Sequence, residues 1–378
     1  MRERARPARV LLAVEQLRRR VPGGIGSYAR GLLQGLDECA AADEPGDVTL
    51  LASRAPRGGD PLAAFGRPLL ASRLPGPLLT RVWDVGGWRV PAAYDVVHSV
   101  SLAAPAPRAG SRWASVVTVH DVAWRRVPEA TTRRGRRWHE SALRRAVSAN
   151  CALVVTSQLV ASDLQRDGVD PDRITIVRGG SDHLSDEDLT GADSLLERLG
   201  VRGPFLLTVG TLEPRKNIAR LVDAFVSVRS SVPDVALVVV GPTGWGEAAP
   251  RDVARLDVHF TGGVSDAVLA GLYRRARAFA YVPLTEGYGL PPLEAMRAGL
   301  PAVVSREVPS AHDVGDPAPA PARLVDPLDV EDIAAGTLEV LTDDILRADL
   351  VMRGERHAAA RTWHDAAHRH LQLWERLS

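Results

Sequence analysis

Apolar residues recur along this chain in two patterns that predict two kinds of secondary structure. Short runs of β-branched and aliphatic residues, for example at 9–14, 115–119 and 236–240, are typical of strands buried on both faces of a parallel sheet. Apolar residues spaced three or four positions apart, for example at 218–230, predict helices with one buried face. Because such strands and helices alternate, the pattern predicts doubly wound α/β sheets.

The alternation stops once, in a polar and acidic segment at 183–203 that we interpret as a linker with a short helix. We expect the first series to contain further strands at 48–52, 94–98, 152–156 and 174–177. The second series has expected strands at 205–209, 258–260, 278–282 and 302–304, and helices at 267–276 and 329–341. A chain of 378 residues exceeds what one core normally serves, so we predict domains at 1–183 and 204–360.

The last residues, 361–378, carry an apolar stripe with the period of a helix, which predicts a separate C-terminal helix. The stripe consists of Trp363, Ala366, Ala367, His370, Leu371, Trp374 and Leu377. Residues 53–93, by contrast, are rich in Pro, Gly and Arg, and we predict no element for them.

Composition narrows the class of protein without pointing to a function. Hydrophobic residues make up 45% of the chain and charged residues 25%, which is ordinary for a soluble globular protein. The net charge of +1 gives no overall field that would attract nucleic acid. Cys39 and Cys151 lack the spacing of zinc ligands or of a disulfide framework, which fits a reducing cytoplasm. No apolar run approaches the ~20 residues of a membrane span, so we expect a soluble or peripheral protein.

The richest candidate chemistry lies where the expected strand 278–282 leads into a turn. Glu286 and Glu294 are separated by seven residues, with two glycines and two prolines between them. Glycine lets a backbone turn tightly and approach a ligand, and proline suits the first turn of a helix. We therefore predict a helix that begins near Pro291 and ends at Gly299.

This geometry would make a site for an anion beside two carboxylates. N–H groups near Leu290 and the positive end of the helix dipole would face a phosphate. Glu294, expected in the first helical turn, would accept hydrogen bonds from a ribose diol, and Glu286 from a second hydroxylated group. A phosphate between two such carboxylates describes a nucleotide sugar. Either glutamate alone would more often be a helix cap or a partner of the dipole.

The whole constellation resembles the donor-binding motif of retaining glycosyltransferases of family 4, in particular bacterial group 1 enzymes of mannosyl or rhamnosyl type. The resemblance implies the GT-B fold, with two Rossmann-like domains facing across a cleft and the helix at 361–378 crossing back to the first domain. It implies that Glu286 contacts the donor sugar and Glu294 the ribose. Residues 53–93 would then lie on the acceptor side.

Two positions in the first domain match the family less specifically. Gly24 lies in a glycine loop after the first expected strand, where the resemblance implies contact with the donor diphosphate or the acceptor. His120 follows the strand at 115–119, where the resemblance implies that it contacts the donor sugar or assists proton transfer. A plain tight turn and a structural His-Asp pair are the alternatives. We interpret His98, at the end of the strand 94–98, as structural.

The loop after the strand at 205–209 carries the remaining match. Arg215 and Lys216 resemble the Arg and Lys that hold the donor diphosphate in the family, although adjacent basic residues more often mark a plain surface. Gly210, Gly289 and Leu290 complete the expected donor-binding residues.

We expect no metal and no cofactor. The acidic motifs Asp170-Pro171-Asp172 and Asp186-Glu187-Asp188 lie in polar connecting segments rather than at a strand end that faces the expected cleft. The charge on the diphosphate would then be balanced by the protein itself. Two segments depart from the family pattern, Arg178-Gly179 in the first domain and residues 311–316 in the second.

The resemblance implies transfer of a sugar from a nucleoside diphosphate sugar, with retention, to a glycan, lipid-linked or small-molecule acceptor. GDP-mannose is the favoured donor. The alternatives are another GT-B enzyme, such as a sugar epimerase or a phosphorylase, and a non-catalytic subunit that binds a nucleotide sugar. Arg133–Arg145, which includes Trp138, is either a solvated helix face or a patch that docks the cytoplasmic protein on the inner face of the membrane.

Overall fold

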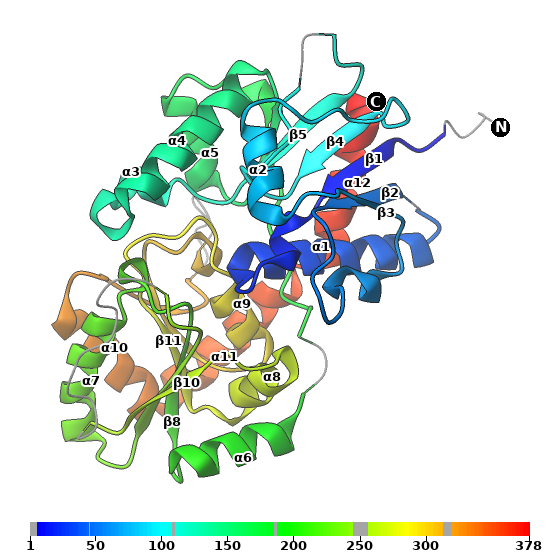
Figure 1. Ribbon diagram of the computed structural model, residues 1–378. Coiled ribbons are helices and arrows are strands. Elements are labelled where there is room, and N and C mark those ends of the chain that lie inside the picture. Colours follow the sequence, from blue (N-terminus) through cyan, green and yellow to red (C-terminus); the bar gives the residue numbers. More distant parts are fainter. Residues whose placement is uncertain (1–5, 45, 108–109, 185–186, 245–255, 313–318) are drawn as a thin grey trace. The chain divides into compact units, whose positions relative to one another are not determined.

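The computed structural model describes residues 6–44, 46–107, 110–184, 187–244, 256–312 and 319–378. The chain divides into two compact units (Figure 1). Unit 1 comprises Met1–Arg125, Thr131–Gly179 and Trp363–Ser378, and unit 2 comprises Arg126–Ala130 and Gly180–Thr362. Each has a parallel sheet with helices, so the predicted fold class of two Rossmann-like α/β domains is confirmed.

Unit 1 contains a seven-stranded sheet in the order β3-β2-β1-β4-β5-β6-β7. Its strands are β1 (Arg9–Ala13), β2 (Asp47–Ala52), β3 (Leu69–Ala71), β4 (Val96–Ser99), β5 (Ala114–Val119), β6 (Ala152–Val155) and β7 (Ile174–Ile176). All neighbouring strands pair in parallel. The direction of winding reverses between β1 and β4, which is the kind of point where open α/β sheets bind ligands beyond the carboxyl ends of their strands.

The helices of unit 1 correct two expectations. They are η1 (Glu15–Arg18), α1 (Gly23–Ala41), η2 (Pro61–Phe65), α2 (Gly76–Asp84), α4 (Arg133–Ser148), α5 (Gln158–Arg166), η4 (Pro171–Arg173) and α12 (Trp363–Leu377), with α3 (Ala123–Arg126) at its boundary. The expected glycine loop around Gly24 is the first turn of α1, because the chain turns earlier, through η1. Residues 53–93, for which no element was predicted, contain η2, β3 and α2.

The predicted C-terminal helix is confirmed as α12, which packs along α1 within unit 1 (Figure 1). Two glycines of α1 make the close approach feasible. A Cβ atom on Gly31 would lie 2.0 Å from the ring of Trp363, and one on Gly35 would lie 2.0 Å from the backbone of that tryptophan. Leu373 takes a buried place, whereas Leu371 and Leu377 of the predicted stripe are half-buried.

Unit 2 contains a six-stranded parallel sheet in the order β10-β9-β8-β11-β12-β13. Its strands are β8 (Phe205–Val209), β9 (Ala236–Val240), β10 (Val258–Gly262), β11 (Ala278–Tyr281), β12 (Ala302–Ser305) and β13 (Arg323–Val325). Its helices are η3 (Pro128–Ala130), α6 (Leu189–Leu199), η5 (Pro214–Lys216), α7 (Ile218–Ser231), α8 (Asp266–Arg275), α9 (Leu290–Arg297), η6 (Pro309–Ala311), α10 (Val330–Thr342) and α11 (Asp344–Ala359).

One strand and one α-helix of unit 2 were not predicted. β13 has three residues, which is too short for a period to show. In α11 the buried residues Leu350, Gly354 and Ala358 form a narrow stripe of mostly small side chains, while Ile345 and Met352 are exposed, so the apolar pattern is weak. Across the described residues of both units, no helix has the length and apolar character needed to cross a membrane.

Candidate active site

A cluster of charged side chains lies beyond the carboxyl ends of β8 and β11, where the strand order of unit 2 reverses. The short helix η5, after β8, carries Arg215 and Lys216. The segment between β11 and α9 carries Glu286. The structure therefore brings these three predicted site residues together, although they come from two separate loops.

One oxygen of Glu286 is the centre of this cluster. Arg215 Nη1 lies 2.7 Å from Oε1, and Lys216 Nζ donates a hydrogen bond to the same atom at 2.5 Å. The hydroxyl of Tyr281 donates to it as well, at 2.8 Å. Glu286 is only 8% exposed, so these partners replace the water that the carboxylate has lost.

The electrostatics of the cluster keep Glu286 ionised. Burial alone would raise the pKa of this carboxyl group, but Arg215 and then Lys216 outweigh burial and lower the pKa to about 2. Burial and the negative charge of Glu286 raise the pKa of Tyr281 well above its ordinary value, so that its hydroxyl stays protonated as a donor. Glu213 pairs with Arg215 Nη2 at 2.7 Å, which gives two cations and two carboxylates.

The loop that carries the two cations is fixed by backbone contacts. Asn217 adopts a left-handed conformation with φ of 61°, and its side-chain amide donates to the carbonyl oxygens of Val282 and Pro327 at 2.9 and 2.7 Å. The N–H of Leu284 donates to the carbonyl oxygen of Arg215 at 2.9 Å. Both bonds to the segment after β11 hold η5 against the loop of Glu286, so the cluster is preorganised.

Lys216 stands out against the composition of the chain, because it is the only lysine among 47 basic residues. Its Nζ donates to the hydroxyl of Tyr281 at 2.7 Å, and its ammonium lies over that ring, 5.1 Å from the centroid. A Cβ atom on Gly210 would lie 3.4 Å from the Cδ and Cε atoms of Lys216. The aliphatic stem of Lys216 therefore passes close to Gly210, and its ammonium donates to Tyr281 and Glu286 from a single atom.

Glu294 lies apart from this cluster and has its own partners. It is the fifth residue of α9, in the second turn rather than the expected first turn. Its Oε2 accepts a hydrogen bond from Tyr273 Oη at 2.8 Å, and its Oε1 lies 3.2 Å from His183 Nε2. The rings of Tyr273, Phe279 and Tyr281 form a row with centroids 5.7 and 6.0 Å apart, which connects the two glutamates.

The start of α9 offers fewer donors than the sequence suggested. Gly289 has φ of 97°, and a Cβ atom there would lie 2.6 Å from Val308 Cγ1, so glycine is required. Leu290 is the first helical residue, as expected for a helix beginning near Pro291. The next two residues are prolines without an N–H group, so Leu290 alone of the first three can present a backbone donor to an anion.

The two remaining predicted residues belong to unit 1. His120 follows β5, and its Nε2 donates to the carbonyl oxygen of Val100 at 2.7 Å, which leaves Nδ1 as the acceptor of the neutral ring. Burial lowers the pKa of His120. A Cβ atom on Gly24 would meet nothing within 4 Å, so packing inside the chain does not require glycine there.

Sequence reasoning missed several partners of the site. Tyr281 and Phe279 lie two positions apart on β11, and this spacing was a signal that both side chains leave the same face. Tyr273 lies on α8, and His183 lies in the segment before α6, so nothing local connected either of them to Glu294. Asn217 directly precedes α7, and nothing in the local sequence marked it as the anchor of the loop.

The remaining residues singled out in the sequence have structural roles or lie outside the described residues. His98 is fully buried and bonded to Thr118 and Trp374, so its structural interpretation is confirmed. Asp170 and Asp188 cap η4 and α6. Asp186 and residues 313–316 lie outside the described part of the chain. Among the described residues, no group of three His, Cys, Asp or Glu side chains could hold a metal ion.

The segment Arg133–Arg145 forms most of α4, whose N-terminus is capped by Thr132. Trp138 Nε1 donates to Asp84 Oδ2 at 3.1 Å, and Arg145 pairs with the same carboxylate. These two side chains face the protein, whereas Arg133, Arg134, Arg137 and Arg144 are exposed.

Comparison with known proteins gives consistent results over both units. A family model described as "Glycosyl transferases group 1" matches residues 197–357, and one described as "Glycosyltransferase Family 4" matches residues 22–183. The chain is 31% identical over 277 residues to the O-antigen chain mannosyltransferase B of Escherichia coli, covering 70% of each chain. It is 30% identical over 318 residues to a D-inositol 3-phosphate glycosyltransferase of Jonesia denitrificans, covering 76% of this chain and 73% of the other.

A crystal structure of HepE from Anabaena, in complex with UDP and glucose, superposes with a TM-score of 0.70 at 18% identity, covering 98% of this chain and 99% of the other. At that identity the likeness bears on the fold alone. Together with the two family models and the relatives, it leads to one conclusion: the chain belongs to the group 1 glycosyltransferases of family 4 and has their GT-B fold.

Proposed function

We propose that this glycosyltransferase transfers mannose from GDP-mannose to a glycan or lipid-linked acceptor with retention of configuration, and without a metal ion. The observation that carries the proposal is the cluster of Arg215, Lys216 and Glu286 in unit 2. The name of the Escherichia coli relative, a mannosyltransferase that builds O-antigen chains, supports the sugar and the polymer pathway.

The cluster suits a diphosphate leaving group. Charge grows on the diphosphate as the glycosidic bond breaks, and preorganised cations stabilise that state more than the bound substrate. Lys216 has three N–H bonds and uses two of them on Tyr281 and Glu286, which leaves one for a phosphate oxygen. Glu286, ionised at every pH of interest, is then the acceptor for the hydroxyls of the donor sugar.

The contacts of Glu294 are compatible with ribose binding. An ionised carboxylate has about four lone-pair sites, of which Tyr273 and His183 occupy two. Two hydroxyls of a ribose could share the others. In unit 1, Nδ1 of the neutral His120 ring would accept a hydrogen bond from the donor sugar, and the open space at Gly24 would admit a ligand.

The single lysine gives a direct test of the donor site. An amine-acylating reagent has only one side-chain amine to modify, and mass spectrometry can follow Lys216 alone. We expect GDP to slow acylation of Lys216 more than UDP does. If neither nucleotide slows the acylation, Lys216 does not lie in the donor site.

Product analysis then separates transfer from the alternatives. Incubation of GDP-mannose with candidate acceptors in EDTA should yield an α-linked mannoside, identified by its anomeric proton, because GDP-mannose is itself α-linked. Inverted product would contradict retention, and activity restored only by Mg²⁺ or Mn²⁺ would contradict the metal-free mechanism. Epimerised sugar without transfer, or binding without turnover, would favour the alternative functions.

Membrane docking through Arg133–Arg145 stays a prediction, to be tested by salt-sensitive sedimentation with anionic liposomes.

A further inference from the structure

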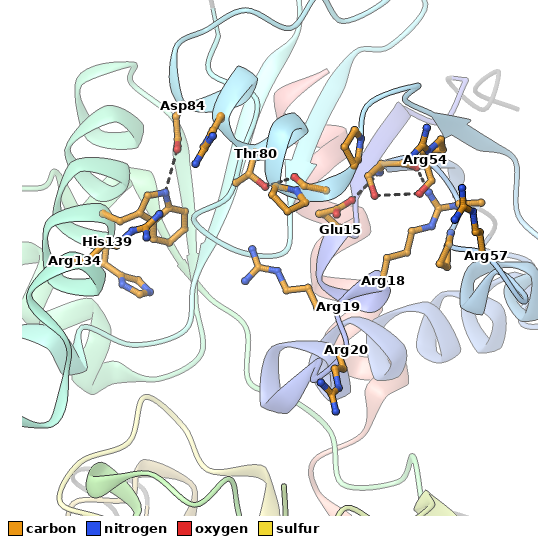
Figure 2. A pocket seen from close by; sticks show the side chains of 18 residues that line it. Glu15, Arg18, Arg19, Arg20, Arg54, Arg57, Thr80, Asp84, Arg134 and His139 are labelled. Atoms are coloured by element: carbon orange, nitrogen blue, oxygen red, sulfur yellow. Dashed lines mark hydrogen bonds between the residues drawn. The ribbon is translucent and has the colours of Figure 1, made fainter. Parts of the chain in front are cut away.

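Unit 1 contains a pocket of about 1350 Å³ beyond the carboxyl ends of β1, β2 and β3 (Figure 2). Its floor is formed by η1 after β1, the loop 53–57 after β2, and the first residues of α2 after β3. Arg134 and His139 of α4 lie at one end of the view, and Arg54 and Arg57 lie at the other. This is the edge of a doubly wound sheet where ligands bind.

The lining of the pocket is strongly cationic. Seven arginines line it, against two carboxylates: Arg18, Arg19, Arg20, Arg54, Arg57, Arg81 and Arg134. Both carboxylates are already engaged. Glu15 is buried and accepts a hydrogen bond from the N–H of Ser53 at 2.7 Å, and Asp84 pairs with Arg145 and Trp138.

Most of these arginines lack a partner in the described part of the chain. Arg18 is bound to Asp60 and to the carbonyl oxygen of Ser53, and its side chain is only 2% exposed. The side chains of the other six have no ion pair or hydrogen bond among the described residues. Some exposed arginines elsewhere are paired, for example Arg275 with Asp193, whereas others, such as Arg202 and Arg297, have no partner among the described residues. The pocket is distinguished by the gathering of six such side chains around one cavity.

The shape of the pocket is held by the protein and does not depend on the arginines. A Cβ atom on Gly76 would lie 2.2 Å from Glu15 Oε1, so α2 begins directly against this buried carboxylate. The same carboxylate ties the loop after β2 through Ser53. Glu15 thus joins the three segments of the floor, and the arginines project from a fixed frame.

We propose that this pocket binds the acceptor and that the acceptor carries a phosphate or diphosphate ester; the proposal rests on the proposed function. Guanidinium groups bind phosphate oxygens in a bidentate manner, and several of them can surround one multiply charged group. A single carboxylate of an acidic glycan would leave most of these cations unpaired. The volume exceeds the ~300–1,000 Å³ of ordinary ligand sites, which leaves room for more of the acceptor beside the phosphate.

Inorganic pyrophosphate is the probe for the first experiment, with binding measured by calorimetry. The pocket variant is Arg54→Ala/Arg57→Ala, and the matched control is Arg133→Ala/Arg137→Ala, which removes two exposed arginines that do not line the pocket. We expect the pocket variant to weaken pyrophosphate binding by about tenfold per arginine, and the control to leave it unchanged. Any binding to the donor site is common to both variants and cancels.

Two further arms distinguish the source of the phosphate. If the acceptor is a soluble sugar phosphate, glucose 1-phosphate should compete with pyrophosphate in the intact protein and not in the pocket variant. If it is a lipid, phosphatidylcholine vesicles containing phosphatidic acid should sediment more of the intact protein and of the Arg133→Ala/Arg137→Ala control than of the pocket variant. Pure phosphatidylcholine vesicles should sediment none of the three. Either result supports the proposal.

Equal pyrophosphate affinity in the intact protein and both variants would overturn the proposal. An equal loss of pyrophosphate affinity in the pocket variant and the control would also overturn it, because the affinity would then depend on the net charge of the protein and not on the pocket. Protection of Lys216 by nucleotides reports on unit 2 alone. Nucleotides could fail to protect Lys216 while the pocket variant alone loses pyrophosphate affinity. That result would contradict the proposed function and support the anion site.

Discussion

Unit 1 and unit 2 handle charge in opposite ways. Unit 2 buries a balanced cluster, in which Arg215 and Lys216 are matched by two carboxylates. Unit 1 leaves its surplus arginines exposed around a pocket and buries neutral histidines instead. The difference suggests that the cluster in unit 2 is complete before its ligand arrives, whereas the pocket in unit 1 is electrostatically incomplete without one.

The buried histidines of unit 1 are neutral because burial disfavours the charged form of each ring. His370 Nδ1 donates to the carbonyl oxygen of Ala366, and its Nε2 accepts from the hydroxyl of Tyr28. His98 accepts from Trp374 at Nδ1 and donates to Thr118 from Nε2. Burial lowers the pKa of both rings, that of His370 to about 4. Protonation of either ring would break one of these bonds.

The largest expected effect comes from breaking the balance in unit 2. Glu286→Gln leaves two cations in a buried site without their common partner, and loss of one member of a buried ion pair costs about 3–5 kcal/mol. Urea unfolding followed by pulsed hydrogen exchange should show this loss in peptides of unit 2. The exposed control Glu197→Gln should stay within about 0.5 kcal/mol of the unmodified protein. A small change in Glu286→Gln would mean that the carboxylate is not the centre of the cluster.

Next in size is the effect of Lys216 on catalysis. Removing one preorganised stabiliser of transition-state charge lowers kcat by ~10²–10³, and we expect this loss in Lys216→Ala. Lys216→Arg should recover little of it, because a guanidinium spreads its donors over a plane, whereas Lys216 Nζ donates to both Tyr281 and Glu286 from one atom. The control is the exposed Arg202→Ala in the same unit. A normal kcat with a raised KM would assign Lys216 to ground-state binding only.

The stability of the two units should also depend on pH in different ways. An unfolded histidine binds a proton near pH 6.5 and folded His370 near 4, so unit 1 should lose stability as the pH falls through this window. Glu286 titrates at 4.5 unfolded and about 2 folded, so unit 2 should lose its contribution only between those values. The pKa shift of each group corresponds to about 3 kcal/mol in the free energy of unfolding.

Urea unfolding at a series of pH values, resolved by unit, measures both windows. His98 adds a second proton to the response of unit 1, so His370→Gln should flatten the slope between pH 6.5 and 4 without abolishing it. Identical pH profiles for the two units would contradict the contrast between buried charge and buried neutral rings.

The two regions also differ in how far they could be predicted from the sequence. The alternation of strands and helices, the motif around Glu286, and the pair Arg215 and Lys216 are local patterns, and the structure contains the predicted elements and brings the three charged residues together. The arginine pocket is assembled from segments that start near residues 15, 53, 75 and 134, each of which looks like an ordinary polar loop or helix.

Contacts between residues far apart in the sequence could not be predicted either, because they depend on the tertiary fold. His183 reaches Glu294 from across more than a hundred residues, and His98 meets Trp374 across 276. Local periodicity carries no information about such pairs, because the tertiary fold alone decides which loop ends adjoin. Glu294 is the fifth residue of α9 rather than the fourth, since the helix begins at Leu290, one residue before the prolines.

The smallest expected effect concerns the unliganded arginine pocket. Repulsion among exposed like charges is weak and is screened over about 10 Å at 0.1 M salt. We therefore expect Arg54→Ala/Arg57→Ala to stabilise unit 1 by less than about 1 kcal/mol at low salt, and by nothing measurable at high salt. Arg275→Ala, which removes a partner of Asp193 in unit 2, should have the opposite sign. If instead the pocket variant is less stable at low salt, its arginines have protein partners, and the surplus of charge that distinguishes unit 1 from unit 2 does not exist.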